Sequence, residues 1–173
     1  MFDLDYVVFR PHNVYGEYQN IGDKYRNVVG IFMNQIMQGN PLTIFGDGEQ
    51  TRAFSYIGDI SPHIANCINI PEAYNKVFNI GADQEYTVNE LAETTMEVMG
   101  AKQDIRHLEA RNEVQHAYSD HTKAYKVFGK KEGTPLKEGL QKMADWAQKV
   151  GARESSKFEN IEINENLPPI WTE

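Results

Sequence analysis

Two segments of the sequence carry the side chains best suited to hold an anion. Asn13 lies in RPHNVYG, directly after an apolar run, and its amide can donate a hydrogen bond to a phosphate or a hydroxyl. Arg52 ends the segment GDGEQTR and enters the apolar run AFSYI, where a guanidinium needs an anionic partner. That partner is either an acidic side chain of the protein or a ligand phosphate, and Asn13 equally well caps a turn. The residue types alone leave these alternatives open.

The sequence lacks the motifs of several enzyme classes. It contains no P-loop, no H-E-x-x-H, no G-x-S-x-G, no EF-hand loop and no G-x-G-x-x-G. The histidines do not have the spacing of metal ligands, so we expect no metal site; they are His12, His63, His107, His116 and His121. The chemistry that remains is binding by polar residues at strand ends and in tight turns.

An excess of acidic residues limits the partners. The 173 residues contain 17 Lys and Arg against 25 Asp and Glu, which gives a net charge of −8 and a pI near 5.1. This balance argues against binding along the phosphate backbone of nucleic acids. One phosphate or diphosphate needs only one or two arginines and a few backbone N–H groups, so a small anionic ligand is compatible with the charge.

The sequence also indicates the cellular compartment in which the protein is expected. No window approaches the ~18 consecutive apolar residues that span a bilayer, and the first residues, MFDLDYVVFR, contain acids where a secretory signal has bases. We therefore expect no membrane association. The single cysteine, Cys67, can form no intramolecular disulfide, which favours a reducing compartment. We expect a cytoplasmic protein.

Short strands that alternate with helices must position the polar residues. The β-branched and aromatic runs predict strands over residues 5–10, 42–45, 51–57, 76–80 and 104–108. The first of these has the composition of a buried strand, and the second and third flank Gly46-Asp47-Gly48 as a β-turn-β unit. The apolar periodicity predicts helices over residues 24–38, 59–71, 87–100, 120–129 and 134–151. The sequence thus predicts an α/β chain.

Several helix starts have recognisable caps. Thr87 and Glu90 have the spacing of a capping box. Asp59 is expected to cap the second helix, and either Asp120 or Thr122 the fourth. Thr134 followed by Pro135 predicts a cap with proline at the first helical position of the fifth helix.

Four segments, in this order, carry a resemblance to a known family: RPHNVYG, GNPLTIFGDGEQTRAFSYIGD, VFNIG and YSDHTKA. They are similar to the carboxyl-terminal part of the extended short-chain dehydrogenase/reductases, the NAD-dependent nucleotide-sugar epimerase/dehydratase family. The similarity is strongest to the branch that contains UDP-glucose 4-epimerase. It extends from about Tyr6 to Val150.

The resemblance implies a particular organisation of the α/β fold: a small mixed α/β substrate-binding domain plus the last strand of an absent Rossmann-type sheet. Residues 1–16 would be the terminal strand and loop of a missing NAD-binding domain. Residues 17–151 would bind the sugar nucleotide, and residues 152–173 would form an irregular tail. Dimers of the family pair mostly through helices of the absent half, so the oligomeric state is left open.

The resemblance also implies roles for individual residues. His12 would lie beside the nicotinamide of NAD, the cofactor of the family. Arg52 would reach the phosphates of the ligand, and Arg111 and Glu113 would complete the pocket, since a diphosphate suits two guanidinium groups and ribose hydroxyls suit a carboxylate. The residues implied to bind a UDP-sugar or dTDP-sugar are Asn13, Asn27, Val28, Thr43, Ile44, Phe45, Arg52, Arg111 and Glu113.

The sequence departs from the family pattern at three places. Ala53 stands where the family usually has aspartate, which removes a possible partner of Arg52. Gly30 replaces a frequent proline, and the segment that begins at Arg111 is one residue shorter. Residues of the last motif match well and are expected to pack and cap the next helix; they are Tyr118, Asp120 and Lys123.

The family's catalytic equipment has no counterpart here. Its G-x-x-G-x-x-G fingerprint, its Y-x-x-x-K pair and the preceding Ser or Thr lie upstream of the first strand, so we assign no catalytic residue. The preferred hypothesis is the substrate-binding portion of an epimerase or dehydratase for C4 oxidation and reduction, inactive by itself. The alternatives are a non-catalytic nucleotide-sugar binding module and a vestigial interaction protein.

Overall fold

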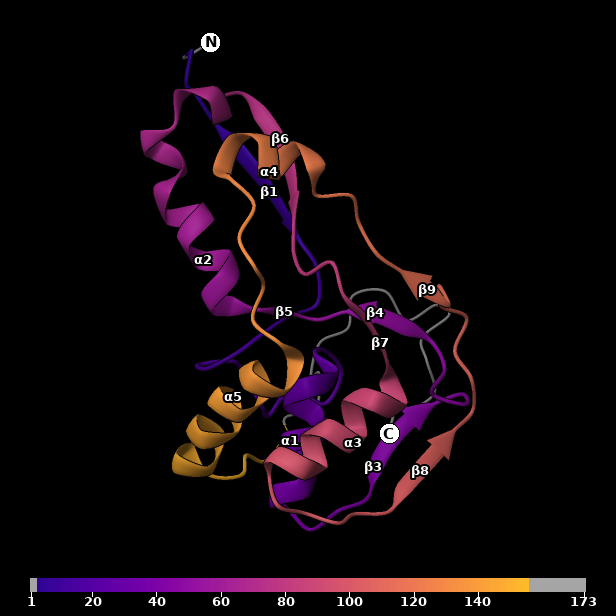
Figure 1. Ribbon diagram of the computed structural model, residues 1–173. Helices are drawn as coiled ribbons and strands as arrows, with labels where there is room; N and C mark the ends of the chain where they lie inside the picture. The colour runs from indigo at the N-terminus through magenta and orange to yellow at the C-terminus, as the bar shows by residue number, and fades with distance from the viewer. Residues whose placement is uncertain (1–2, 156–173) are drawn as a thin grey trace.

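The computed structural model describes residues 3–155, which form an upper and a lower part in Figure 1. The upper part contains β1 (Val7–Pro11), α2 (Ile57–Asn66), β6 (Lys76–Ile80) and α4 (Thr122–Phe128). The lower part contains α1 (Val28–Met37), β3 (Leu42–Phe45), α3 (Val88–Val98), β8 (Ile105–Leu108) and α5 (Leu136–Val150). Short strands lie between them, namely β2 (Val14–Tyr15), β4 (Thr51–Ala53), β5 (Ser55–Tyr56), β7 (Glu85–Thr87) and β9 (His116–Ala117). Two 3₁₀ turns, Cys67–Asn69 and Pro71–Ala73, follow α2.

The strands form small, mainly parallel sheets. β1 pairs with β6, β2 with β5 and β3 with β8, each in parallel, while β4 lies between antiparallel β7 and parallel β9. The predicted β-turn-β unit is therefore wrong, because β3 and β4 belong to different sheets. Gly46 and Gly48 have φ of 71° and 81°, and Asn89 at the start of α3 donates to the Asp47 carbonyl, so the turn leads the chain away from β3.

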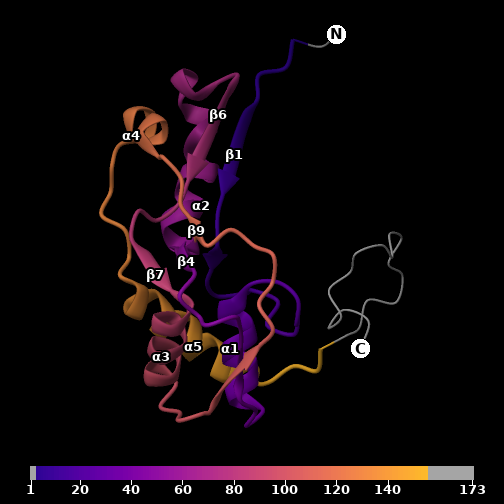
Figure 2. The ribbon, with the colours of Figure 1, turned by 90° about the vertical axis from the view of Figure 1, so that its right-hand side faces the viewer.

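Each part has its own hydrophobic core, and Figure 2 shows the two parts from the side. In the lower core α1, α3 and α5 pack around β3, with Phe32, Met33, Leu91, Leu140 and Met143 fully buried. In the upper core Phe78 of β6 contacts the rings of Phe9 in β1 and Phe128 in α4. The upper core thus joins segments that are far apart in the sequence.

β1 is more exposed than its composition indicates. Val7 and Phe9 pack against the upper core, whereas the alternate residues Tyr6 and Val8 are 53% and 42% exposed. Within residues 3–155, β6 is its only strand partner. The prediction of a buried strand is wrong for this structure, since one face and one edge of β1 are open.

The first helix begins later than predicted, at Val28 instead of residue 24. The Asp23 carboxylate accepts hydrogen bonds from the N–H groups of Tyr25 and Arg26, which forms a turn. Asn27 follows with a left-handed φ of 64°, and the helix starts directly after it. The local turn therefore replaces the first helical turn.

The predicted strand 51–57 is divided into β4 and β5, and α2 begins at Ile57. Asp59 consequently lies in the first turn of α2 and is not its cap. Its carboxylate accepts hydrogen bonds from the N–H and hydroxyl of Thr134 instead, at 2.8 and 2.9 Å. Thr134 is therefore not the cap of α5, which has Pro135 at the N-cap position and starts at Leu136.

The short strands β2, β7 and β9 were not predicted, because two or three residues carry no periodic pattern. At α4, Asp120 accepts a hydrogen bond from the Thr122 N–H at 2.8 Å, while His121 occupies the N-cap position. Residues 152–155 have no helix or strand, as predicted, and the rest of the expected tail lies outside the described residues.

The predicted capping box of α3 is present: Thr87 accepts from the Glu90 N–H at 3.0 Å, and Glu90 accepts from the Thr87 N–H at 2.7 Å. We expect Thr87→Ala to lower the free energy of unfolding by about 1 kcal/mol, since it leaves a backbone donor without its partner. Urea denaturation measures this. Thr94→Ala on the same helix removes only a bond to the Glu90 carbonyl, and an equal loss in that variant would contradict a special role for the cap.

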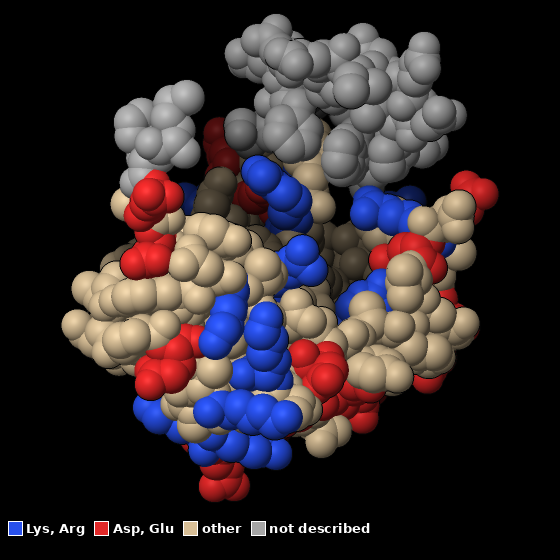
Figure 3. All heavy atoms as spheres, turned by 90° about the horizontal axis from the view of Figure 1, so that it is seen from above, with Lys and Arg blue, Asp and Glu red and all other residues tan. Residues whose placement is uncertain are grey.

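The acidic excess is not spread evenly over the surface. Figure 3 shows the top of the molecule, where Lys and Arg side chains gather in a band with Asp and Glu side chains at its margins. Local regions of positive charge therefore exist on a chain with a net charge of −8.

Candidate functional site

A cavity of about 460 Å³ lies between β3, β4 and α1. Its walls come from the chain after β1, the loop before α1, the two strands and the segment after β8. Every residue to which the resemblance assigned substrate binding lines this cavity, namely Asn13, Asn27, Val28, Thr43, Ile44, Phe45, Arg52, Arg111 and Glu113. The fold thus gathers these residues around one space, although they are spread over a hundred positions of the sequence.

Arg52 has an acidic partner within the protein. Its guanidinium lies 3.1 Å from the Glu113 carboxylate, and it also donates to the carbonyls of Thr51 and Gln115, at 2.7 and 3.1 Å. The Arg52 side chain is 16% exposed, whereas that of Glu113 is 40% exposed. Glu113, from a distant loop, therefore supplies the partner that Ala53 cannot provide, and the guanidinium is held at the cavity wall.

Arg111 stacks on the ring of Phe45. Its guanidinium carbon is 3.3 Å from the ring centroid, close enough for a cation–π contact. Its Nε is buried and has no hydrogen-bond partner among residues 3–155. Burial lowers the pKa of Arg111, although Glu113 opposes the shift. A partly buried guanidinium at the wall of a cavity suits an anionic ligand.

The edge of β3 that faces the cavity has no strand partner among residues 3–155, although side chains bind part of it. The N–H groups of Leu42 and Gly46 donate to carbonyls at the two ends of β8, so those of Thr43 and Phe45 point to the opposite side. On that side Gln35 of α1 accepts from the Thr43 N–H at 3.2 Å and donates to its hydroxyl at 2.8 Å. The Gln50 amide donates to the Phe45 carbonyl at 2.9 Å.

The side chain of Asn13 does not cap a local turn but bonds to a residue 40 positions further along the chain. Asn13 has a left-handed φ of 44°, and its amide donates to the Ala53 carbonyl at 3.3 Å. Its own carbonyl accepts from the Ser55 N–H at 3.0 Å. Asn13 is thereby fixed at the cavity wall, and its contact with a ligand stays a prediction.

The charged side chains that line the cavity are Asp23, Lys24, Arg52, Arg111 and Glu113. Of the two acids, Glu113 is paired with Arg52, and Asp23 lies 2.7 Å from the Arg26 guanidinium. Burial acts to raise the pKa of Asp23, but hydrogen bonds from Tyr25 and Arg26 hold it below its ordinary value. Lys24 and Arg111 therefore leave the cavity with an excess of positive charge.

Comparison with known proteins bears on the family of this chain. The model of the NAD dependent epimerase/dehydratase family matches residues 1–81. A protein from Methanocaldococcus jannaschii named "Putative UDP-glucose 4-epimerase" is 33% identical over 147 residues, which are 84% of this chain and 47% of that protein. A crystal structure of UDP-glucose 4-epimerase with UDP-glucose from Thermotoga maritima superposes with a TM-score of 0.76 and 32% identity, over 85% of this chain and 47% of that one. The chain belongs to the NAD-dependent epimerase/dehydratase family.

Membership of the NAD-dependent epimerase/dehydratase family confirms the resemblance and the α/β fold class. The predicted cofactor of the family is confirmed as well. A structure of UDP-glucuronic acid 4-epimerase from Bacillus cereus, in complex with UDP-glucuronic acid and NAD, has a TM-score of 0.74 at 25% identity over 83% of this chain and 45% of that one. This 173-residue chain spans about half the length of the relatives that it matches.

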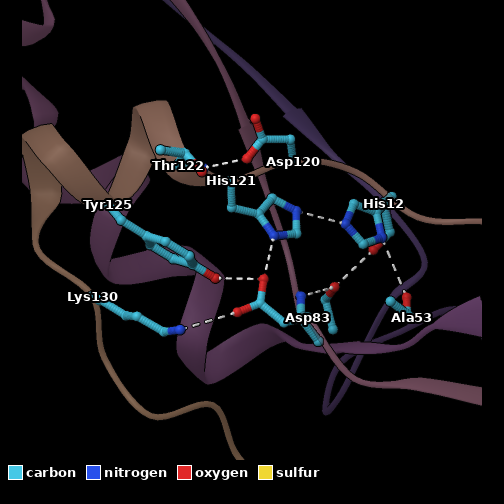
Figure 4. Close-up of polar contacts among 10 residues, drawn as sticks. His12, Ala53, Asp83, Asp120, His121, Thr122, Tyr125 and Lys130 are labelled. Atoms are coloured by element: carbon cyan, nitrogen blue, oxygen red, sulfur yellow. Dashed lines mark hydrogen bonds and ion pairs between the residues drawn. The ribbon is translucent and has the colours of Figure 1, made fainter.

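His12 does not line the cavity that holds the other predicted residues. Its Nδ1 lies 3.2 Å from the Ala53 carbonyl oxygen and its Nε2 lies 2.9 Å from Nε2 of His121, as Figure 4 shows. Both ring nitrogens are thus engaged within the protein. The described residues therefore do not fit a polar contact between the His12 nitrogens and a cofactor, and the proximity of His12 to NAD stays a prediction.

Several lining residues were missed by the sequence analysis, among them Lys24, Gln35, Asn40 and Gln50. Gln35 had one signal: together with Asn34 it interrupts the apolar residues of α1, between Met33 and Ile36. Residues 3–155 include no group of three His, Cys, Asp or Glu side chains placed to hold a metal ion. None of the helices in this range is long and apolar enough to cross a membrane.

Proposed function

We propose that this chain is the substrate-binding portion of an NAD-dependent nucleotide-sugar epimerase or dehydratase, and that its 460 Å³ cavity holds the nucleoside diphosphate of a UDP-sugar or dTDP-sugar. The observation that carries the proposal is the arrangement of Arg52 and Arg111 in one cavity with the edge of β3 that no described strand covers. The two arginines suit a diphosphate, and the strand edge suits a nucleobase. The relatives named for UDP-sugars support this choice of ligand.

The parts of the ligand would meet chemically suitable groups. Guanidinium groups bind phosphate oxygens through paired, charge-assisted hydrogen bonds, which suits Arg52 and Arg111. The half-exposed Glu113 carboxylate can accept hydrogen bonds from ribose hydroxyls while it remains paired with Arg52. On the edge of β3, Gln35 and Gln50 leave the Thr43 carbonyl and the Phe45 N–H for the polar edge of a pyrimidine, beside the apolar ring of Phe45.

The division of the chain into domains is part of the same proposal. Residues 1–16 would belong to an NAD-binding half, residues 17–151 would form the sugar-nucleotide domain, and 152–173 would be a tail. The open edge of β1 and the exposed side chains of Tyr6 and Val8 support a further contact there. The structure modifies this division: β6, α2 and α4 lie within residues 17–151 but share the core of β1. We therefore assign these three elements to the NAD-binding half and the rest of residues 17–151 to the sugar-nucleotide domain.

Isothermal titration calorimetry of the full chain tests the function. We expect saturable heat with UDP, dTDP and UDP-glucose, and none with inorganic phosphate at the same concentration, because phosphate lacks the base and ribose. Equal responses to UDP and phosphate would reduce the site to a general anion site. No heat at millimolar UDP would contradict the proposal and favour a vestigial pocket.

A non-catalytic nucleotide-sugar binding module would give the same titration, since it shares the cavity. An assay of UDP-glucose conversion with added NAD distinguishes the two possibilities. The chain contains neither G-x-x-G-x-x-G nor Y-x-x-x-K, so we expect no turnover unless a polypeptide with these motifs is added. Turnover by the chain alone would contradict the proposal that this chain binds the substrate without catalysing the reaction.

A further inference from the structure

A chain of polar contacts connects Asp83 to the cavity wall through two histidines (Figure 4). The Asp83 carboxylate lies 2.9 Å from Nδ1 of His121, whose side chain is completely buried. Nε2 of His121 lies 2.9 Å from Nε2 of His12, and Nδ1 of His12 lies 3.2 Å from the Ala53 carbonyl oxygen. The two rings are nearly parallel, with an interplanar angle of 10°.

The partners at the two ends determine how many protons the chain holds. A carboxylate and a carbonyl oxygen only accept, so Nδ1 of His121 and Nδ1 of His12 must both carry a proton. The contact between the two Nε2 atoms needs one more proton, because one nitrogen must donate and the other accept. Three of the four ring nitrogens are therefore protonated, and the pair carries one positive charge opposite Asp83.

We propose that His121 and Asp83 are positioning residues, which fix His12 and the neighbouring Asn13 by means of one proton shared between the two histidine rings. The proton count does not depend on the function of the cavity. Its effect on a ligand rests on the proposed binding of a nucleoside diphosphate.

The Ala53 carbonyl connects the histidines to the cavity. It accepts from both the His12 ring and the Asn13 amide, and Asn13 lines the cavity. The backbone on this side is held as well, since Ser55 donates its hydroxyl to the His12 carbonyl at 2.9 Å and accepts from the Ala82 N–H at 2.9 Å. A displacement of the His12 ring thus changes the hydrogen bonding of Asn13.

The fold leaves space for this arrangement at Gly81. A Cβ atom on Gly81 would lie 2.2 Å from Nε2 of His12, so any side chain here would displace the ring from His121. Gly81 follows directly after β6. The close approach of ring and backbone explains why glycine suits the position.

The charged groups around the pair favour a single proton. Asp83 also accepts from the Tyr125 hydroxyl at 2.8 Å and lies 3.7 Å from the Lys130 ammonium, and Asp120 precedes His121 in the chain. Burial and the neighbouring His121 lower the pKa of His12 below its ordinary value of 6.5, which disfavours a second proton. Burial acts to raise the pKa of Asp83, but its hydrogen bonds from His121 and Tyr125 keep it low and the carboxylate charged.

The contact between the rings should exist only in the singly protonated state. With a second proton, two N–H groups face each other. With none, both Nε2 atoms are bare, since Ala53 and Asp83 hold the remaining protons on the Nδ1 atoms. The pKa of His12 is lowered in the folded chain, so the unfolded chain binds a proton on this residue at a higher pH than the folded chain does. The contribution of His12 to the free energy of unfolding therefore decreases as the pH falls below 6.5.

Nuclear magnetic resonance of the full chain with ¹⁵N-labelled histidine tests the proton count, with a titration from about pH 5 to about pH 9. We expect a range of pH in which three of the four ring nitrogens of His12 and His121 carry protons, with loss of the shared proton at its upper end. Asp83→Asn should move that loss to lower pH, whereas His107→Gln, an exposed histidine that bonds the Gly46 carbonyl, should not. Two neutral rings throughout the titration would overturn the proposal.

Calorimetry with UDP over the same pH range tests the link to the cavity. We expect affinity to be greatest where the pair holds one proton, and Asp83→Asn and Gly81→Ala to weaken binding about 3- to 10-fold there while they flatten the pH profile. Unaltered affinity and pH profile in both folded variants would overturn the positioning role. Absence of UDP binding at every pH would refute the proposed function and leave the proton count to the resonance experiment.

Discussion

Arg52→Ala is expected to weaken the binding of UDP by about 10- to 150-fold, which corresponds to the loss of about 1.5 to 3 kcal/mol for a hydrogen bond to a charged group. The guanidinium lies at the wall of the cavity, fixed by Glu113 and two backbone carbonyls, so little ordering is needed when a phosphate binds. Isothermal titration calorimetry with UDP measures the effect.

Two further variants make the result specific. Arg52→Lys keeps the charge but not the planar fork, and its affinity should lie between those of the parent and Arg52→Ala. Arg106→Ala removes an exposed arginine of β8 that does not line the cavity, and should leave the affinity unchanged. Equal affinity of Arg52→Ala and the parent would assign Arg52 to structure alone, as the internal ion pair with Glu113 allows.

Phe78→Ala is expected to lower the free energy of unfolding by about 3 to 5 kcal/mol, the usual cost of removing a buried phenyl ring. Phe78 is completely buried at the centre of the upper core. Its ring centroid lies 5.0 Å from that of Phe128 and 6.1 Å from that of Phe9, so the substitution breaks the aromatic contacts between β6, α4 and β1. Urea denaturation measures the loss.

Tyr118→Ala is the control, because Tyr118 is 71% exposed and its removal should change stability by less than about 0.5 kcal/mol. Hydrogen exchange adds spatial detail. Amides of β6 should lose protection in Phe78→Ala, whereas those of α5, which pack in the lower core, should lose less. A loss below about 1 kcal/mol would show that the upper part contributes little to the stability of this chain.

The elements that sequence patterns predicted well have local causes. The capping box at Thr87 and Glu90 is present because both bonds form within one turn of helix. The strands over residues 42–45 and 76–80 have the predicted bounds, and α4 ends before Gly129. Helix starts were less predictable, since Asp23 and Asp59 bond to partners that compete with a cap.

Both the sequence and the tertiary structure were needed to define the candidate site. The resemblance to the family implied nine of the residues that line the cavity, and the fold brings all nine together. The resemblance did not reveal the partner of Arg52, because Glu113 lies on a loop 61 residues further along the chain. It also did not reveal that both nitrogens of His12 are engaged by Ala53 and His121.

The sequence by itself thus predicted most of the helices, the longer strands, the resemblance to the family and nine of the residues that line one cavity. Each of these depends on neighbouring residues or on a motif that is continuous in the chain. Only the tertiary structure decided that β3 pairs with β8, that β4 lies between β7 and β9, and that Asp83, His121 and His12 form a single chain of contacts. Parallel pairing and buried polar contacts join residues that are distant in sequence, so their free energy appears only when the whole core is assembled.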